Sequence, residues 1–179
     1  SQKKKNKVFL STGMSNIKEI KKAMKLLKKN DVTLLHCVSA YPTKIEEINL
    51  NFMKKLKEIF KCPVGLSDHS PGFLAPVIAT SLGAKVIEKH VTFNKKSKGP
   101  DHQSSLSIKE FKQMIKLVRE TELILGQEKK ILSKDEKLNL KAVRKSCVSN
   151  RNIKKGDVIK KSDISFKRPG TGISPFLIS

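Results

Sequence analysis

Hydroxyl, imidazole and carboxylate side chains recur directly after short apolar segments between residues 10 and 102. Five motifs carry them: Leu-Ser-Thr-Gly-Met (10–14), His-Cys-Val-Ser-Ala-Tyr-Pro-Thr (36–43), Gly-Leu-Ser-Asp-His (65–69), Ile-Glu-Lys-His (87–90) and Gly-Pro-Asp-His (99–102). Such groups can bind anions, transfer protons or ligate metals, and the same groups often only cap loops. Their function therefore depends on whether the fold brings them to one place.

The elements that must position these motifs repeat in one order: a short apolar strand, a polar loop and a helix. Predicted strands cover residues 7–11, 32–38, 64–67 and 84–88, and predicted helices cover 17–29, 49–60, 74–82 and 108–125. In the first helix, apolar residues recur every three to four positions, and Asn16 can cap its start. Ser107 and Gly126 are placed to begin and end the last helix.

Alternating strands and helices predict parallel strands joined by right-handed crossovers. Four such units fit either a small open sheet or half of an eight-stranded barrel, and periodicity alone does not choose between them. The location of the polar motifs favours the barrel, because barrel enzymes place their active sites at the carboxyl ends of the strands. We therefore predict an α/β fold of about four βα units from a TIM (β/α)8 barrel over residues 1–130.

The last part of the chain has a different composition. Residues 131–142 are highly charged and predict a linker, whereas residues 146–149, 152–157 and 164–167 predict short strands and turns. Residues 143–179 are therefore expected to form the beginning of a small, truncated β-rich domain.

In this order and spacing, the five motifs, together with Lys-Arg-Pro-Gly at 167–170, resemble those of the sialic acid synthase family. The resemblance runs over essentially the whole chain. It implies the C-terminal half of that family's barrel, followed by the start of its antifreeze-like SAF (β-clip) domain. It also implies a transferase that condenses phosphoenolpyruvate with N-acetylmannosamine, or a related 2-acetamido hexose, to give a sialic acid and phosphate.

The resemblance further implies a divalent metal, manganese or magnesium, held by His69 and His90. Both histidines end adjacent predicted strands, and two neutral imidazoles leave positions open for water and substrate. The simpler alternative is that each histidine only holds its loop through hydrogen bonds.

The resemblance implies substrate-binding roles for residues with hydroxyl, carboxylate and guanidinium side chains. Ser11, Ser39 and Ser67 would bind phosphate or carboxylate, although relatives often carry Asn where Ser39 stands. The remaining candidates are Tyr41, Glu88, Asp101 and Arg168. Glu88 and His90 are the predicted catalytic pair, and for each carboxylate the alternative is an ordinary ion pair with a lysine.

Arg168 resembles the arginine that the antifreeze-like domain of one subunit places over the active site of another. A domain-swapped homodimer is therefore expected for the full-length protein. The family's first four strands supply further phosphate-gripping lysines, and none of these precedes Ser11 here. We accordingly expect this polypeptide to be inactive alone.

Composition limits the remaining classes of function. The net charge of +22 comes almost entirely from lysine, with arginine only at 119, 144, 151 and 168. Because specific nucleic-acid readers favour arginine, the lysines predict solvated helix surface, with no nucleic-acid partner. No apolar run approaches the length of a membrane span, and three widely spaced cysteines predict a reduced, cytoplasmic protein without membrane contact.

Two alternatives stay open. The legionaminic acid branch of the same family carries the same motifs, and His102 in Gly-Pro-Asp-His favours the neuraminic and legionaminic branches over the pseudaminic one. The other alternative is a noncatalytic module that binds sugar or anion without turnover.

Overall fold

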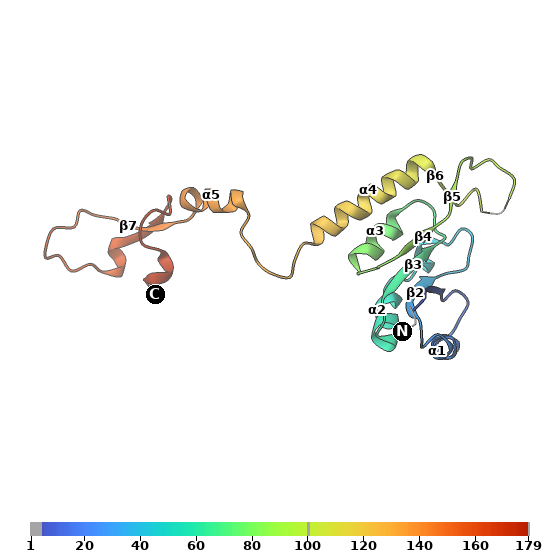
Figure 1. Ribbon diagram of the computed structural model, residues 1–179. Coiled ribbons are helices and arrows are strands. Elements are labelled where there is room, and N and C mark those ends of the chain that lie inside the picture. Colours follow the sequence, from blue (N-terminus) through green and yellow to red (C-terminus); the bar gives the residue numbers. More distant parts are fainter. Residues whose placement is uncertain (1–4, 100, 179) are drawn as a thin grey trace. The chain divides into compact units, whose positions relative to one another are not determined.

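The computed structural model describes residues 5–99 and 101–178. They divide into two compact units, and the boundary along the chain lies between Gly126 and Gln127 (Figure 1). The outermost residues of both predicted domains, and Pro100 in the fifth motif, lie outside the described residues. None of the described helices is both long and apolar enough to cross a bilayer.

Four parallel strands form the sheet of the first unit, in the order of the sequence. They are β1 (Lys7–Ser11), β2 (Asp31–Cys37), β3 (Val64–Asp68) and β4 (Ile87–Lys89). Because every strand pairs with the next one along the chain, all connections cross over on the same face, as they do in a barrel. This α/β arrangement agrees with the predicted part of a TIM barrel.

The predicted caps Asn16 and Ser107 each start a helix, whereas the helix expected over 17–29 ends at Leu26 and the helix expected over 49–60 begins at Phe52. The helices are α1 (Ile17–Leu26), α2 (Phe52–Phe60), α3 (Leu74–Ser81) and α4 (Ile108–Leu125). Asn16 and Ser107 each form a capping box, with Glu19 and Glu110 respectively, and these boxes satisfy backbone donors of the first turn. Gly126 follows α4 with φ 57°, a conformation that favours glycine.

The hydrophobic core lies between one face of the sheet and these helices. Alternate strand residues such as Leu34 and Leu66 point into it and meet Leu56 of α2 and Ala79 of α3. The intervening residues point to the opposite face, where Phe9 is 57% exposed. The helix face therefore holds the unit together, and on the opposite face Leu35 is buried whereas Phe9 of the edge strand β1 stays exposed.

The fourth strand and the loop after it also differ from the prediction. The fourth strand begins at Ile87 instead of residue 84, although Lys85 and Val86 already bond to Val64 and Leu66. A short parallel pair, β5 (Val91–Thr92) and β6 (Leu106–Ser107), also closes the base of the loop between them. These two-residue strands carry no periodic pattern that a sequence could reveal.

The second unit contains an antiparallel pair, β7 (Ser146–Ser149) and β8 (Ile164–Lys167), where two of the short strands were predicted. Residues 152–157 form a loop with a turn and no strand. The segment predicted as a linker contains α5 (Lys134–Val143), which a Ser133–Glu136 capping box starts. Gly170 N donates to Lys141 O, so this helix is attached to the end of the strand pair.

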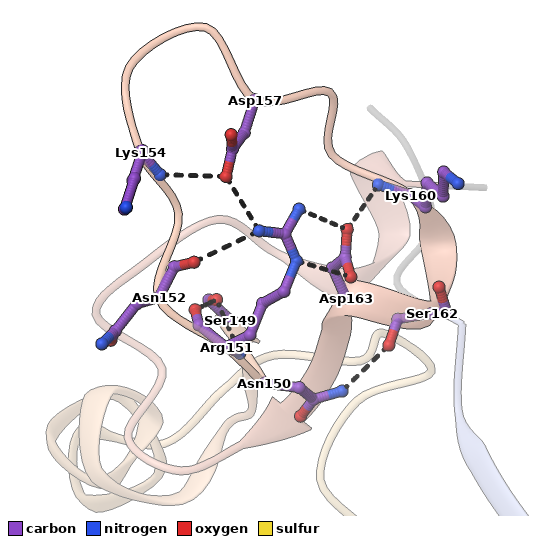
Figure 2. Close-up of polar contacts among 9 residues, drawn as sticks. All are labelled: Ser149, Asn150, Arg151, Asn152, Lys154, Asp157, Lys160, Ser162 and Asp163. Atoms are coloured by element: carbon purple, nitrogen blue, oxygen red, sulfur yellow. Dashed lines mark hydrogen bonds and ion pairs between the residues drawn. The ribbon is translucent and has the colours of Figure 1, made fainter.

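Arg151 organises the long loop between β7 and β8 (Figure 2). Its guanidinium donates to both carboxylate oxygens of Asp163, at 2.9 and 3.2 Å, and to Asp157 at 2.9 Å. A further bond goes to the Asn152 carbonyl. Hydrogen bonds from Arg151 lower the pKa of both aspartates below the ordinary range, so the cluster is fully formed above that range.

We predict that Arg151→Gln raises the pKa of Asp157 and Asp163 towards that of a free aspartate, about 3.9. Because the folded pKa values are lowered, the stabilisation from this cluster is present above pH ~4 and is lost as the pH falls through the lowered values. Carbon-detected NMR titration of the side-chain carboxyls measures the pKa change. Denaturant unfolding over the same pH range measures the change in stability. Arg119→Gln, which breaks an exposed pair with Glu122 in α4, is the matched control. Unchanged aspartate titrations in Arg151→Gln would contradict the prediction.

Candidate active site at the carboxyl ends of the strands

The site is built at the carboxyl ends of β3 and β4, where strand alternation selects its side chains. Ser67 and Glu88 are paired in the parallel register, and the Ser67 hydroxyl donates to Glu88 Oε1 at 2.7 Å. His69 and His90 each follow two residues later and therefore lie on the same face. Four predicted site residues thus come from two neighbouring strands.

The rings of Tyr41, His69 and His90 lie against one another. The centroids of the two imidazoles are 5.3 Å apart, and the Tyr41 ring lies 4.2 Å from His69 and 5.9 Å from His90. His69 Nδ1 lies 3.0 Å from the Val38 carbonyl. Since a carbonyl only accepts, Nδ1 carries the hydrogen in this bond, and Nε2 keeps its lone pair. His69 is thereby fixed in the tautomer that a metal ligand needs.

Asp101 completes the cluster from the loop between β5 and β6. Its Oδ2 lies 3.9 Å from His90 Nδ1. The Asp101 carbonyl accepts bonds from the Ser104 hydroxyl and from the backbone and hydroxyl of Ser105. These bonds fold the loop into a turn that keeps the carboxylate beside His90.

Tyr41 reports the electrostatics of this region. Partial burial raises the pKa of its hydroxyl, and Coulombic interactions with Cys37, Asp101 and Glu88 raise it further. The phenol therefore stays protonated at neutral pH and can donate a hydrogen bond. Because its ring is 49% exposed, that donor remains accessible to a ligand.

The other predicted residues come from β1, the loop after β2 and the second unit. Ser39 stands in the loop after β2, and Cys37 Sγ lies 3.8 Å from its hydroxyl and 3.9 Å from His69 Nδ1. Ser11 ends β1 in register with Leu35, two residues before the level of Cys37. Arg168 belongs to the second unit, directly after β8, and its predicted position over an active site stays a prediction.

The donor set fits a divalent metal in part. Among residues 5–99 and 101–178, no group of three or more His, Cys, Asp or Glu side chains is arranged to hold an ion. Two imidazoles from adjacent strand ends are nevertheless present. His69 donates Nδ1–H to a backbone carbonyl, which is the usual support of a metal-ligating histidine. The remaining positions would go to water and substrate, as a Lewis-acid site requires.

Two polar residues next to the site were not among those predicted. Asp68 and Lys89 alternate with the site residues and form a buried ion pair on the helix face, with Nζ and Oδ2 2.7 Å apart. The signal is present in Ser-Asp-His and Glu-Lys-His, where charged residues occupy strand positions that should face the core. His36 is also buried on that face. Its Nε2 lies 2.7 Å from the Ile48 carbonyl, and burial lowers its pKa, so it serves structure.

A parallel sheet with helices on one face and polar groups converging at the carboxyl ends of its strands is consistent with part of a TIM barrel. The NeuB family model matches residues 1–130. The chain therefore belongs to the NeuB family, which the motifs had indicated.

Known proteins agree with this assignment. The chain is 43% identical over 173 residues to N,N'-diacetyllegionaminic acid synthase of Campylobacter jejuni, covering 94% of this chain and 52% of that protein. It is 42% identical over 177 residues to pseudaminic acid synthase of C. jejuni, covering 97% and 51%. The crystal structure of N-acetylneuraminic acid synthetase from Leptospira borgpetersenii superposes with a TM-score of 0.68 at 35% identity, covering 74% of this chain and 47% of that one.

The chain spans about half the length of the curated relatives it matches. Legionaminic and pseudaminic acid synthases match it almost equally well, so overall identity does not separate the branches. The preference that His102 gives stays a prediction. In the structure, His102 Nδ1 lies 2.7 Å from the Thr92 hydroxyl and supports the β5–β6 loop.

Gly13 offers a test of how tightly the loops after β1 and β2 pack. A Cβ at this position would overlap the Ser39 hydroxyl and lie 2.9 Å from Cys37 Sγ. We predict that Gly13→Ala lowers the free energy of unfolding by about 1–3 kcal/mol, because overpacking forces neighbours to move. Denaturant unfolding measures this change.

Adding Ser39→Gly to Gly13→Ala should restore part of the loss, since it removes the nearer of the two obstacles. A Gly13→Ala variant as stable as the wild type would show that the two loops are not in contact.

Proposed function

We propose that this chain is the C-terminal part of a sialic acid synthase. The enzyme would condense phosphoenolpyruvate with N-acetylmannosamine, or a related 2-acetamido hexose, and water to give an N-acetylneuraminate-type acid and phosphate. The observation that carries the proposal is the juxtaposition of Tyr41, His69 and His90 beside Glu88. Membership of the NeuB family and relatives named as nonulosonic acid synthases support it.

In the proposed reaction, the methylene carbon of phosphoenolpyruvate forms a bond to the aldehyde carbon of the open-chain sugar. Water then adds to the resulting cation, and the bond between that carbon and the phosphate oxygen breaks in the tetrahedral intermediate. One molecule each of phosphoenolpyruvate, sugar and water therefore yields one acid and one phosphate. The reaction needs groups that bind the phosphate and carboxylate of phosphoenolpyruvate, orient the hydroxyl-rich sugar and transfer protons.

The cluster offers groups for each of these tasks. Glu88 would bind the sugar and accept or return a proton, with its carboxylate oriented by Ser67. Tyr41 would donate to a sugar hydroxyl and Asp101 would accept from one. Ser11, Ser39 and Ser67 would donate to the phosphate or carboxylate of phosphoenolpyruvate.

His69 and His90 would hold a divalent metal, manganese or magnesium. When bound, the metal would supply Lewis acidity at the aldehyde oxygen. The Val38 carbonyl would keep His69 in the required tautomer, and Asp101 would support His90. His90 is thus proposed as both a ligand and a member of the catalytic pair with Glu88.

The complete enzyme would need parts beyond the sheet described here. The proposed first half of the barrel would add phosphate-binding lysines. The second unit would be the start of an SAF domain, whose Arg168 would bind the acetamido side of the sugar in the partner subunit of a domain-swapped dimer. The chain alone is therefore proposed to be inactive. Neither nucleic acid nor membrane is among its proposed partners.

The same geometry serves a second candidate, a legionaminic acid synthase. The 43% identity to the C. jejuni enzyme of that name supports this candidate, and the pseudaminic acid synthase of C. jejuni matches almost as well. The two activities differ only in the sugar, so both are tested in one experiment.

The experiment expresses the chain together with its upstream coding sequence and measures phosphate release from phosphoenolpyruvate. N-acetylmannosamine and its legionaminic-type analogue are each offered with and without manganese. We expect metal-dependent release with one sugar. His69→Ala and His90→Ala should each reduce kcat/KM by a factor of about 10² or more, because each removes one of the two proposed protein ligands of the metal.

Arg119→Gln, which breaks an exposed ion pair with Glu122 in α4 and touches no proposed site residue, is the control and should retain most activity. The chain without its upstream part should release no phosphate. A well-folded, full-length protein that turns over neither sugar would overturn the enzymatic proposal. Binding of sugar or phosphoenolpyruvate without turnover would instead identify a noncatalytic module.

A further inference from the structure

A buried ion pair lies directly behind the proposed site, on the helix face of the sheet. Asp68 stands between Ser67 and His69 in the sequence, and Lys89 stands between Glu88 and His90. Strand alternation directs these two side chains away from the site. They are only 2% and 1% exposed, respectively.

Every polar atom of the pair that needs a partner has one nearby. Lys89 Nζ donates to Asp68 Oδ2 at 2.7 Å and also to the Ser70 carbonyl. The other carboxylate oxygen, Oδ1, accepts from the Ser70 backbone at 2.9 Å and from the Ser70 hydroxyl at 2.7 Å. The pair therefore ties three segments together: the end of β3, the turn after His69, and the end of β4.

Stability alone does not account for such a pair. Two strand positions earlier, the same face carries Leu66 and Ile87, which belong to the apolar core. Moving two charges out of water is costly, and apolar residues of similar size are often at least as stabilising. What an ion pair adds is a fixed distance and direction between the two groups it joins.

We propose that Asp68 and Lys89 form a positioning pair that sets the separation of His69 and His90. Each member is covalently next to one histidine, and the Ser70 contacts fix the turn on the far side of His69. The pair thereby holds the two imidazoles where one ion could reach both. The part of this inference that concerns metal binding rests on the proposed function. The part that concerns the position of His69 does not rest on it.

The test uses the full-length protein with three substitutions: Asp68→Asn, Lys89→Met and the two combined. Each single variant leaves one buried charge without its partner and should lower the melting temperature. The double variant removes both charges and should recover most of that loss. If the pair positions the histidines, the double variant should still bind Mn²⁺ at least tenfold more weakly than the wild type, measured by electron paramagnetic resonance.

This divergence between stability and metal affinity separates positioning from simple structural support. Mn²⁺ affinity within twofold of the wild type in the stable double variant would overturn the proposal. Lys95→Met breaks an ion pair of the same length with Glu110 on the surface, 2.7 Å, and is the control that should leave affinity unchanged.

A second readout does not depend on metal or activity. Nitrogen-15 NMR detects the Nδ1–H tautomer of His69 that its bond to Val38 fixes. The double variant should lose this signature and give a mixture of tautomers. If the wild type binds no Mn²⁺, the proposed metal site fails, and the His69 tautomer alone tests the positioning role. A mixture of tautomers in the double variant would then support that role, and an unchanged tautomer would overturn it.

Discussion

The parallel register of β3 and β4 determines which side chains meet at the site. Leu66 pairs with Ile87, Ser67 with Glu88, and Asp68 with Lys89. Because strand residues alternate between faces, the first and third of these pairs point to the helix face of the sheet, and the Ser67–Glu88 pair points to the site. A shift of one residue in β4 would move Glu88 into the core and Lys89 into the site, and the same shift in β3 would exchange Ser67 and Asp68. The chemistry of this end of the sheet therefore depends on the register.

The hydrophobic face is what fixes that register. Leu34, Leu56 and Leu66 are almost completely buried between the sheet and α2, and burial of such side chains contributes about 1.5–3 kcal/mol each. Ile87 of β4 pairs with Leu66 and packs against the same core, so the observed β3–β4 register keeps both apolar side chains on the helix face. Gly65 adds a steric constraint, since a Cβ there would overlap the Val86 carbonyl and Leu35. The backbone of β3 can approach its neighbours only without a side chain at that point.

Much of this could be predicted from sequence because local signals and tertiary packing agree. The apolar strands and the caps at Asn16 and Ser107 follow from patterns within a few residues, and the placement of His69 and His90 at adjacent strand ends predicted that they would lie close together. The Ser133 cap carried the same kind of signal, but the charged composition around it favoured a linker over α5. Composition was a poorer guide there than the cap and the lack of Gly or Pro in the helix.

The contacts that sequence did not reveal are those between distant segments. Asp68 and Lys89 look like surface charges until alternation and register place them opposite each other on a buried face. The β5–β6 pair likewise depends on residues 15 positions apart, Val91 with Leu106. No periodic pattern encodes such pairings, since each depends on where a neighbouring strand ends.

Part of the proposed site is open to water. The side chains of His90 and Asp101 are 38% and 46% exposed and Tyr41 is 49% exposed, whereas His69 is only 7% exposed. Electrostatic stabilisation is weak where water screens each charge, and enzymes gain from closing the site around the substrate. On the face of the sheet opposite the helices, Phe9 is also exposed, although parallel sheets are normally covered on both faces. In the proposed complete barrel, the other strands would cover Phe9 and enclose the open side of the site, which is the physical reason for proposing activity only for the complete enzyme.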